Sequence, residues 1–393
     1  MSGPLSSLKV LDFSTLLPGP FASLLLADMG ADVLRIESPT RMDLVRVLPP
    51  HADGVSASHA YLNRNKRCMA LDLKKPEAVE LVKRLVLDYD IVLEQFRPGV
   101  MDKLGVGYAA LKAINPKLIY VSITGYGQTG PYKDRAGHDL NYLAVAGLAS
   151  YTGRRDTGPL PLGIQAADIA GGSLHGVMGL LAAVIQRQVT GEGQQVDISM
   201  TDCAFSLHAM AGAGYLACGV EPQMENQALN GGSFYDYYRT RDGRWFSVGS
   251  LEPQFMQQLC AAIGRPELAA RGLNQQPEVQ QALKREIQLE FELRDFAEWR
   301  EVFAALDACV EPLLPLSEAV EHPQIRAREL VVDVPREGKT PQRQIACPIK
   351  FSAGLPAPRH VGAPVGAHSV EVLEGLGYSS EQIEALKTAK VIG

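Results

Sequence analysis

The sequence has no apolar run long enough to cross a bilayer and no export signal. Its longest apolar stretch, from Leu174 to Ile185, is broken by His175 and followed by polar residues. The segment from Met1 to Leu5 has neither the charged nor the apolar region of a signal peptide. We therefore expect a cytoplasmic protein with no membrane partner.

Motifs for metals, disulfides and common cofactors are also missing. The six cysteines are scattered and form no CxxC pair, which excludes a zinc ribbon and a disulfide framework. The sequence contains no P-loop, no GxSxG elbow and no His, Asp and Glu spacing that suits a metal. We therefore expect chemistry by side chains alone, without a metal or a cofactor.

Basic residues are not in excess. The 38 Lys and Arg residues against 44 Asp and Glu give a formal charge of −6, whereas nucleic-acid-binding surfaces usually show a basic excess. The hydrophobic share of 46% and the length of 393 residues fit a globular chain of two domains. No nucleic-acid partner is expected.

Strand and helix signals alternate in the first third of the chain, which predicts an α/β fold with a mostly parallel sheet covered on both faces. Predicted strands are 9–13, 33–37, 69–73, 91–95, 118–124 and 195–199, and predicted helices are 21–29, 76–89, 168–188 and 201–216.

A second, smaller domain follows a polar linker over residues 219–232. Residues 1–218 would form the first part of the large domain and 233–308 the small domain. Residues 309–393 would return to the large domain and complete it. The small domain is predicted to contain a hairpin over 234–240 and 245–249 and helices over 254–263 and 279–306, with short helices 371–376 and 380–388 in the tail.

The first βαβ unit resembles a dinucleotide-binding unit, with Glu37 in the place of the ribose acceptor. However, its turn, Leu16 to Pro20, has no GxGxxG sequence, so backbone amides would not approach a pyrophosphate in the usual way. Nicotinamide and flavin binding are therefore not expected.

Three residues are candidates for proton transfer, and each also has a structural explanation. His138 precedes a predicted helix that Asp139 would cap, but histidine is also suited to proton transfer near neutral pH. Asp168 would cap its own helix, yet Gly171 and Gly172 in the first turn then suggest close approach by a ligand or another backbone. Glu252 is explained equally well as an acid at a helix start.

Several basic residues near strand ends could bind a phosphate-bearing ligand. Arg97 would lie outside the carboxyl end of a strand, where open α/β sheets bind ligands. It is the strongest candidate of a set that includes Arg35, Lys74 and Lys103.

Motifs spread over nearly the whole chain resemble those of the class III CoA-transferase superfamily and, within it, the α-methylacyl-CoA racemases. The GHDxNY run and the EPQF run are the two that resemble racemases. The matching segments are 17–20, 30–37, 72–74, 97–100, 125–131, 137–142, 190–194 and 252–255.

The resemblance implies a Rossmann-like large domain, a smaller α/β domain and an interlocked homodimer. It implies an acyl-CoA thioester as substrate and no cofactor, since coenzyme A is part of the substrate. The active site would lie between the large domain of one subunit and the small domain of the other. The implied catalytic residues are His138, Asp168 and Glu252, and the implied substrate-binding or CoA-binding residues are Arg35, Leu71, Lys74, Arg97, Lys103, Gly137, Asp139 and Tyr142.

Three functions follow from these residues. The first is an α-methylacyl-CoA racemase, in which His138 and Asp168 exchange the α-proton while backbone amides near Asp168 hold the enolate oxygen. The second is a CoA-transferase with Asp168 as nucleophile, where His138 has no clear role. The third is a catalytically silent acyl-CoA-binding protein.

Ser38 stands where relatives often have a basic residue for the adenine end of CoA, and Arg41 is a possible substitute.

Overall fold

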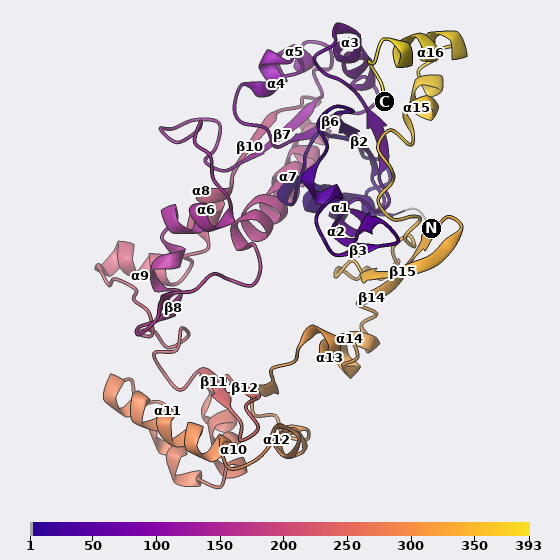
Figure 1. Ribbon diagram of the computed structural model, residues 1–393. Helices are drawn as coiled ribbons and strands as arrows, with labels where there is room; N and C mark the ends of the chain where they lie inside the picture. The colour runs from indigo at the N-terminus through magenta and orange to yellow at the C-terminus, as the bar shows by residue number, and fades with distance from the viewer. Residues whose placement is uncertain (1–2) are drawn as a thin grey trace. The chain divides into compact units, whose positions relative to one another are not determined.

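The computed structural model describes residues 3–393, which form two compact units (Figure 1). Unit 1 contains the chain up to Ala146, Gly163–Leu207 and Gln324–Gly393, and unit 2 contains Gly147–Leu162 and His208–Pro323. Unit 2 is thus larger than the domain expected over 233–308. Ion pairs of Arg154 fasten the inserted segment 147–162 to Asp236 and Glu225 in unit 2.

Six parallel strands form the central sheet of unit 1, in the order β10-β7-β6-β1-β2-β5. From β1 the chain builds outward through β2 and β5, and then crosses to β6, β7 and β10 on the other side. This is the strand order of dinucleotide-binding folds, in which ligands bind at the carboxyl ends of the strands where the order reverses. The bounds are β1 Lys9–Asp12, β2 Asp32–Glu37, β5 Arg67–Ala70, β6 Ile91–Glu94, β7 Ile119–Thr124 and β10 Gln195–Ser199.

Helices cover both faces of this sheet, as expected for parallel strands with continuous apolar sequence. On one face, α3 (Pro76–Leu85), α4 (Val100–Lys103) and α5 (Tyr108–Lys112) pack on the strands together with α15 (Ser369–Gly375) and α16 (Ser380–Thr388). On the other face, α1 (Pro18–Asp28) packs against β1 and β2, and α7 (His175–Thr190) packs against β7 and β10 (Figure 1).

A π-helical segment, η3 (Ala167–Leu174), runs directly into α7. By length and composition alone the combined helix, Ala167–Thr190, is apolar enough to span a membrane, and it is longer than the apolar run predicted from sequence. The core helix of a soluble protein meets the same criteria, and 44% of its most apolar window is buried within this chain.

The other elements of unit 1 are short and lie mainly in its connections. A hairpin of β14 and β15, which the sequence analysis did not predict, follows the return of the chain from unit 2. The bounds are η1 Leu44–Arg46, β3 His51–Ala52, β4 Val55–Ser56, α2 Ala57–Leu62, α6 Asp139–Val145, α8 Met200–Ser206, α14 Pro323–Ala327, β14 Val331–Arg336 and β15 Lys339–Ile345.

Unit 2 is built on a three-stranded antiparallel sheet with an aromatic core that includes Phe246, Phe291 and Trp299. The single helix expected over 279–306 is two helices, because Asp295 and Glu298 form a capping box that starts a new one. The strands are β8 Gly153–Arg154, β9 Gly158–Pro159, β11 Asp236–Arg239, β12 Trp245–Val248 and β13 Val310–Pro312. The helices are η2 Leu148–Tyr151, α9 Ala211–Cys218, α10 Pro253–Ala262, η4 Pro266–Arg271, α11 Pro277–Phe291, α12 Phe296–Phe303 and α13 Leu316–Ala319.

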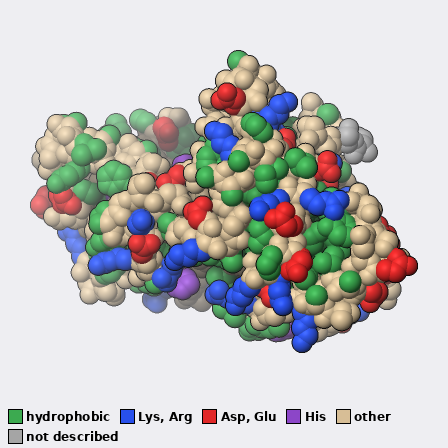
Figure 2. Space-filling view, turned by 90° about the horizontal axis from the view of Figure 1, so that it is seen from above, with side chains coloured by type: hydrophobic (Ala, Val, Ile, Leu, Met, Phe, Trp, Pro, Cys, Tyr) green, Lys and Arg blue, Asp and Glu red, His purple; other side chains and the backbone are tan. Residues whose placement is uncertain are grey.

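Charged side chains of both signs are interspersed on the face of the molecule drawn in Figure 2, with hydrophobic side chains between them. No extended field of one sign covers this face, in keeping with the small net charge of −6.

Candidate functional site

A cavity of about 310 Å³ lies in unit 1 at the carboxyl ends of β6 and β7, beside the point where the strand order reverses. It brings together His138 and Asp168, which are 30 positions apart in the chain. The walls come from the loops after β1, β6 and β7 and from α6, η3 and α8. Its lining residues are Leu16, Pro18, Gln95, Phe96, Arg97, Pro98, Ile123, Thr124, Gly125, Tyr126, Lys133, Arg135, Ala136, Gly137, His138, Tyr142, Asp168 and Met200.

Asp168 lies within the first turn of η3 and does not cap it. The cap position is Ala166, and the carboxylate that accepts from the helix start belongs to Asp139. Asp139 Oδ1 lies 2.6 Å from the amide nitrogen of Ala167 and 3.0 Å from that of Asp168. The expectation that Asp168 caps its own helix is therefore wrong, and its carboxyl group is not needed for the cap.

The carboxyl group of Asp168 has a strongly perturbed pKa. Burial and the negative charge of Asp139 together raise this pKa to about 7, and burial is the larger of the two causes. At neutral pH the Asp168 carboxyl group is therefore present in both protonated and ionised forms.

His138 holds the N-cap position of α6, where its backbone is extended and its side chain is exposed. Asn141 Oδ1 accepts a hydrogen bond of 3.0 Å from the His138 amide, which fixes the start of the helix. Asp139 was expected to cap this helix and instead caps η3. One short run, His138 and Asp139, thus supplies a cavity residue and the cap of the helix that carries Asp168.

Gly171 and Gly172 allow close packing of protein against protein. A Cβ atom on Gly171 would lie 3.1 Å from the carbonyl oxygen of Met200, and one on Gly172 would lie 3.1 Å from the Pro18 side chain. Of the two explanations that the sequence allowed, approach by another part of the chain is the one that the structure shows.

Tyr142 lines the cavity, and its ring packs against Gly125 and Gly137. Its hydroxyl donates to the carbonyl oxygen of Gly137, and a Cβ atom on either Gly125 or Gly137 would fall within 2.6 Å of its ring. Burial, followed by the charge of Asp168, raises the pKa of Tyr142 to about 12. Tyr142 therefore stays protonated and serves as a fixed donor to Gly137.

The structure places three of the expected basic CoA-binding residues either at the cavity or at the surface of unit 1. Arg97 lines the cavity, and its Nη1 lies 3.5 Å from the carbonyl oxygen of Asp134. Lys74 and Lys103 are exposed at the surface of unit 1 and do not line this cavity.

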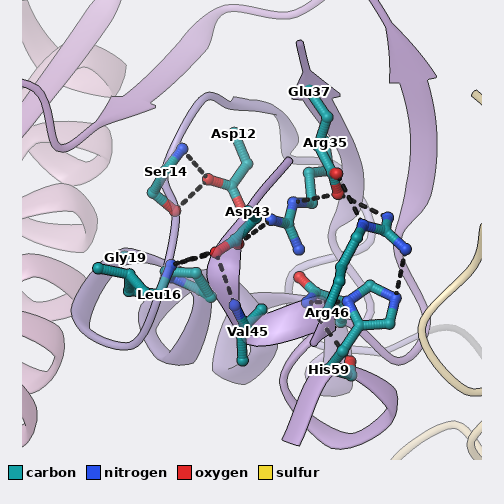
Figure 3. A network of polar contacts seen from close by, with 12 residues as sticks. Asp12, Ser14, Leu16, Gly19, Arg35, Glu37, Asp43, Val45, Arg46 and His59 are labelled. Carbon is teal, nitrogen blue, oxygen red and sulfur yellow. Dashed lines mark hydrogen bonds and ion pairs between the residues drawn. The ribbon is translucent and has the colours of Figure 1, made fainter. Parts of the chain in front are cut away.

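Two further expected binding residues, Leu71 and Arg35, are enclosed by the protein. Leu71 is 1% exposed and pairs with Ile392, which completes the core beside β5. Arg35 is also 1% exposed, and its guanidinium group pairs with Glu37 and Asp43 (Figure 3). This placement leaves the Arg35 guanidinium no surface for a phosphate, because the carboxylates and the surrounding core enclose it.

Two cations of the cavity, Lys133 and Arg135, were not selected from the sequence. Arg135 stacks on the ring of Tyr132 at 3.8 Å, and Tyr132 contacts Tyr126 edge to face. The signal that could have identified them is the glycine-rich run after β7, since a loop at the carboxyl end of a parallel strand is a common ligand contact.

Glu252 lies in unit 2, where it is exposed at the N-cap position of α10 and precedes Pro253. Its placement matches the expected acid at a helix start. Among residues 3–393, no group of three or more His, Cys, Asp and Glu side chains is arranged to hold a metal ion.

Comparison with known proteins agrees with this fold. The sequence model of CoA-transferase family III matches residues 5–369. The chain belongs to CoA-transferase family III. Among solved structures, a CaiB/BaiF family protein from Brucella suis is similar, with a TM-score of 0.83 and 31% identity over 96% of this chain and all of that one.

Relatives within family III include both racemases and transferases. The α-methylacyl-CoA racemase of Homo sapiens is 35% identical over 99% of this chain and 97% of its own length. The succinate–glutarate CoA-transferase of Agrobacterium fabrum is 34% identical over 95% of this chain and 96% of its own. The chain is thus an enzyme of the family III transferase and racemase group, and the identities alone do not separate the two activities.

Proposed function

We propose that the chain is an α-methylacyl-CoA racemase, which epimerises 2-methyl-branched acyl-CoA thioesters through an enolate. The observation that supports this most strongly is the shared cavity of His138 and Asp168. A racemase needs two groups that can each take and return a proton, whereas a transferase that uses Asp168 as nucleophile has no defined use for His138.

The perturbed pKa of Asp168 suits this chemistry. Racemisation requires one group in its base form and the other in its acid form, with the assignment reversed for the other enantiomer. A carboxyl group with a pKa of about 7 supplies either form at neutral pH. In one direction His138 removes the α-proton and protonated Asp168 returns one.

The enolate oxygen needs hydrogen-bond donors, and the amides expected near Asp168 are already used. Those of Ala167 and Asp168 donate to Asp139, and that of Ile169 donates to Gln165. The amides of Asp139 and Leu140 open the first turn of α6 beside His138, and the first amides of a helix have no intrahelical acceptor, whereas the Asn141 amide donates to the His138 carbonyl oxygen. We assign the oxyanion-binding role to this turn.

The remaining roles extend the same proposal. Arg97, Lys133 and Arg135 would face the phosphates of coenzyme A, and Glu252 would support the two bases from the small domain of the other subunit of a homodimer. Because coenzyme A is part of the substrate, the proposal includes no added cofactor. It also includes no metal and no nucleic-acid or membrane partner. The enzyme would act in the cytoplasm.

The alternative is a CoA-transferase, which the identity to transferase relatives favours. In it the Asp168 carboxylate attacks the thioester carbonyl, the CoA thiolate leaves and an acyl-aspartyl anhydride forms. The CoA thiolate then attacks the aspartyl carbonyl, which forms an enzyme-bound aspartyl-CoA thioester and releases the free acid. The acceptor acid attacks this thioester to form a second anhydride, and the released CoA thiolate attacks its acyl carbonyl, which yields the new acyl-CoA and restores the Asp168 carboxylate.

Solvent exchange distinguishes the two functions. Purified protein is given one enantiomer of a 2-methylacyl-CoA in deuterated water, without any acceptor acid, and deuterium at the α-carbon is followed by mass spectrometry. The racemase proposal expects incorporation together with formation of the second enantiomer. A panel of 2-methylacyl groups would then define the acyl preference.

Two comparisons make the result decisive. Asp134→Asn, which changes an exposed carboxylate of the neighbouring loop outside the cavity lining, should leave exchange intact. Transfer of CoA to a free acid, with hydroxylamine trapping at Asp168 and no α-exchange, would replace the proposal with the transferase alternative.

A further inference from the structure

The loop between β1 and α1 has an unusual backbone at Leu16. Its φ angle is +60°, in the left-handed region that non-glycine residues seldom occupy and that persists only where neighbouring contacts hold it. Leu16 of this loop and Pro18, the first residue of α1, line the cavity that contains His138 and Asp168. Whatever holds Leu16 in this conformation therefore also shapes the cavity wall.

Asp43 is the side chain that holds it. The Leu16 amide nitrogen lies 3.2 and 3.3 Å from the two Asp43 carboxylate oxygens, and Asp43 Oδ1 also accepts from the Val45 amide at 3.1 Å (Figure 3). Asp43 is 5% exposed and does not line the cavity. Its contact with the cavity runs through Leu16.

A buried ion network fixes Asp43 in turn. Arg35 pairs with Asp43 through Nη2, and its Nε lies 2.9 Å from Glu37 Oε1. The Glu37 carboxylate also accepts hydrogen bonds from Nε and Nη2 of Arg46, at 2.8 and 2.7 Å (Figure 3). Because the loop anchor is tied to β2 by these pairs, its position is set by the sheet.

The start of α1, directly after this loop, contacts the helix that carries Asp168. Ser173 Oγ lies 2.6 Å from the carbonyl oxygen of Pro18 and 3.1 Å from that of Asp168. At Gly19, the amide donates to Gln95 Oε1 at 2.9 Å, which ties the first turn of α1 to the residue that follows β6. A shift at Leu16 would therefore move the cavity wall and the turn of η3 around Asp168.

We propose that Asp43 is a positioning residue for this cavity, which holds Leu16 in its left-handed conformation and thereby sets the wall that faces the bound acyl-CoA. Asp43 does for this loop what glycines do in dinucleotide-binding folds, since an anchored leucine replaces a residue that adopts positive φ freely. The proposal rests on acyl-CoA binding in the cavity and not on which reaction follows.

A double-mutant cycle tests the assignment through binding of coenzyme A, measured by calorimetry. Asp43→Ala should raise the Kd and the KM for a 2-methylacyl-CoA by about tenfold or more, because a small misplacement of a site wall has large effects. In a Leu16→Gly background the same substitution should change the Kd by less than about threefold, because glycine adopts positive φ without the anchor. Asp43→Asn, which keeps an acceptor for the Leu16 amide, should restore most of the affinity.

The matched control is Asp28→Asn. Asp28 is another buried carboxylate of unit 1, paired with Arg64 and away from this cavity. The assignment predicts that this variant keeps the native Kd even where its melting temperature falls as far as that of Asp43→Ala.

Equal loss of affinity in the Asp28 and Asp43 variants, or an Asp43→Ala effect of the same size in both backgrounds, would overturn the assignment. Because the Kd for coenzyme A is independent of turnover, absence of α-exchange in the native protein would reject the racemase proposal and leave this test valid.

Discussion

Two groups of charge lie along the carboxyl edge of the same sheet, and they are built in opposite ways. At the end of β2 and in the segment that follows it, the carboxylates of Glu37 and Asp43 face the guanidinium groups of Arg35 and Arg46. At the cavity, the pKa of Asp168 is raised by burial and by a second carboxylate, Asp139, and no cation offsets this effect among the described residues.

This difference distinguishes a carboxylate that fixes the backbone from a carboxyl group that can exchange a proton. A carboxylate that is paired with a guanidinium group can hold the backbone, as Asp43 does at Leu16. A carboxyl group that is desolvated without a cation keeps its proton up to neutral pH and can exchange it. The same residue type thus serves two purposes at one edge of the sheet, and four changes test the contrast.

The largest effect is expected from Asp168→Asn. Loss of the group that donates or accepts the proton should lower the rate of racemisation by about 10³-fold, in line with the contribution of a positioned acid or base. The measurement is the initial rate of conversion for each enantiomer. A rate within tenfold of the native rate would remove Asp168 from the proton-transfer step.

Arg35→Met should destabilise the protein by about 3–5 kcal/mol, because it leaves Glu37 and Asp43 buried with one cation fewer. Urea unfolding followed by circular dichroism measures the change. A loss below about 1 kcal/mol, the usual value of an exposed pair, would show that the group after β2 is not the enclosed network described above.

Asp168→Asn should also stabilise the fold at high pH. The pKa of Asp168 is about 7 in the folded protein against an ordinary value of 3.8, so between these pH values the folded state holds the extra proton. Native stability therefore falls as pH rises from about 4 to 7, and asparagine avoids this loss. We expect a gain of about 1–2 kcal/mol at pH 8, reduced from the full linkage value for partial exposure, and none at pH 4.

The smallest effect is expected from Asp139→Asn. Asparagine can still accept from the amides of Ala167 and Asp168, but it carries no charge, so the pKa of Asp168 should fall. The acidic limb of the pH–rate profile should move to lower pH, with stability preserved. Asp139→Ala, by contrast, should lose about 1 kcal/mol with the cap. An unmoved acidic limb in Asp139→Asn would contradict the electrostatic role.

Local sequence determined much of the fold. Strand β10 and helix α16 have the bounds predicted from periodicity and end signals. The hairpin of β14 and β15 was missed because β15 is largely exposed and lacks the apolar alternation that marks a half-buried strand. Strand β5 (Arg67–Ala70) ends earlier than the strand predicted over 69–73. The next residue, Leu71, pairs instead with Ile392, which is distant in sequence.

The site was predictable by residue type but not by environment. The family resemblance selected His138 and Asp168, and the structure places both in one cavity. Sequence did not reveal that Arg35 is enclosed by carboxylates or that Asp139 caps a helix 28 positions away. Those properties depend on tertiary contacts, which a motif does not encode.

The pairing of Leu71 with Ile392 has a consequence for biosynthesis. Val391 and Ile392 are buried in the core that also contains Leu11 and Leu34, whereas residues 208–323 of unit 2 precede them in the chain. During translation unit 2 can therefore fold while one face of the central sheet still lacks α15 and α16. The part of that face that α15, α16 and residues 391–392 cover remains apolar and exposed until the end of the chain is synthesised, so a chaperone would protect the nascent chain there.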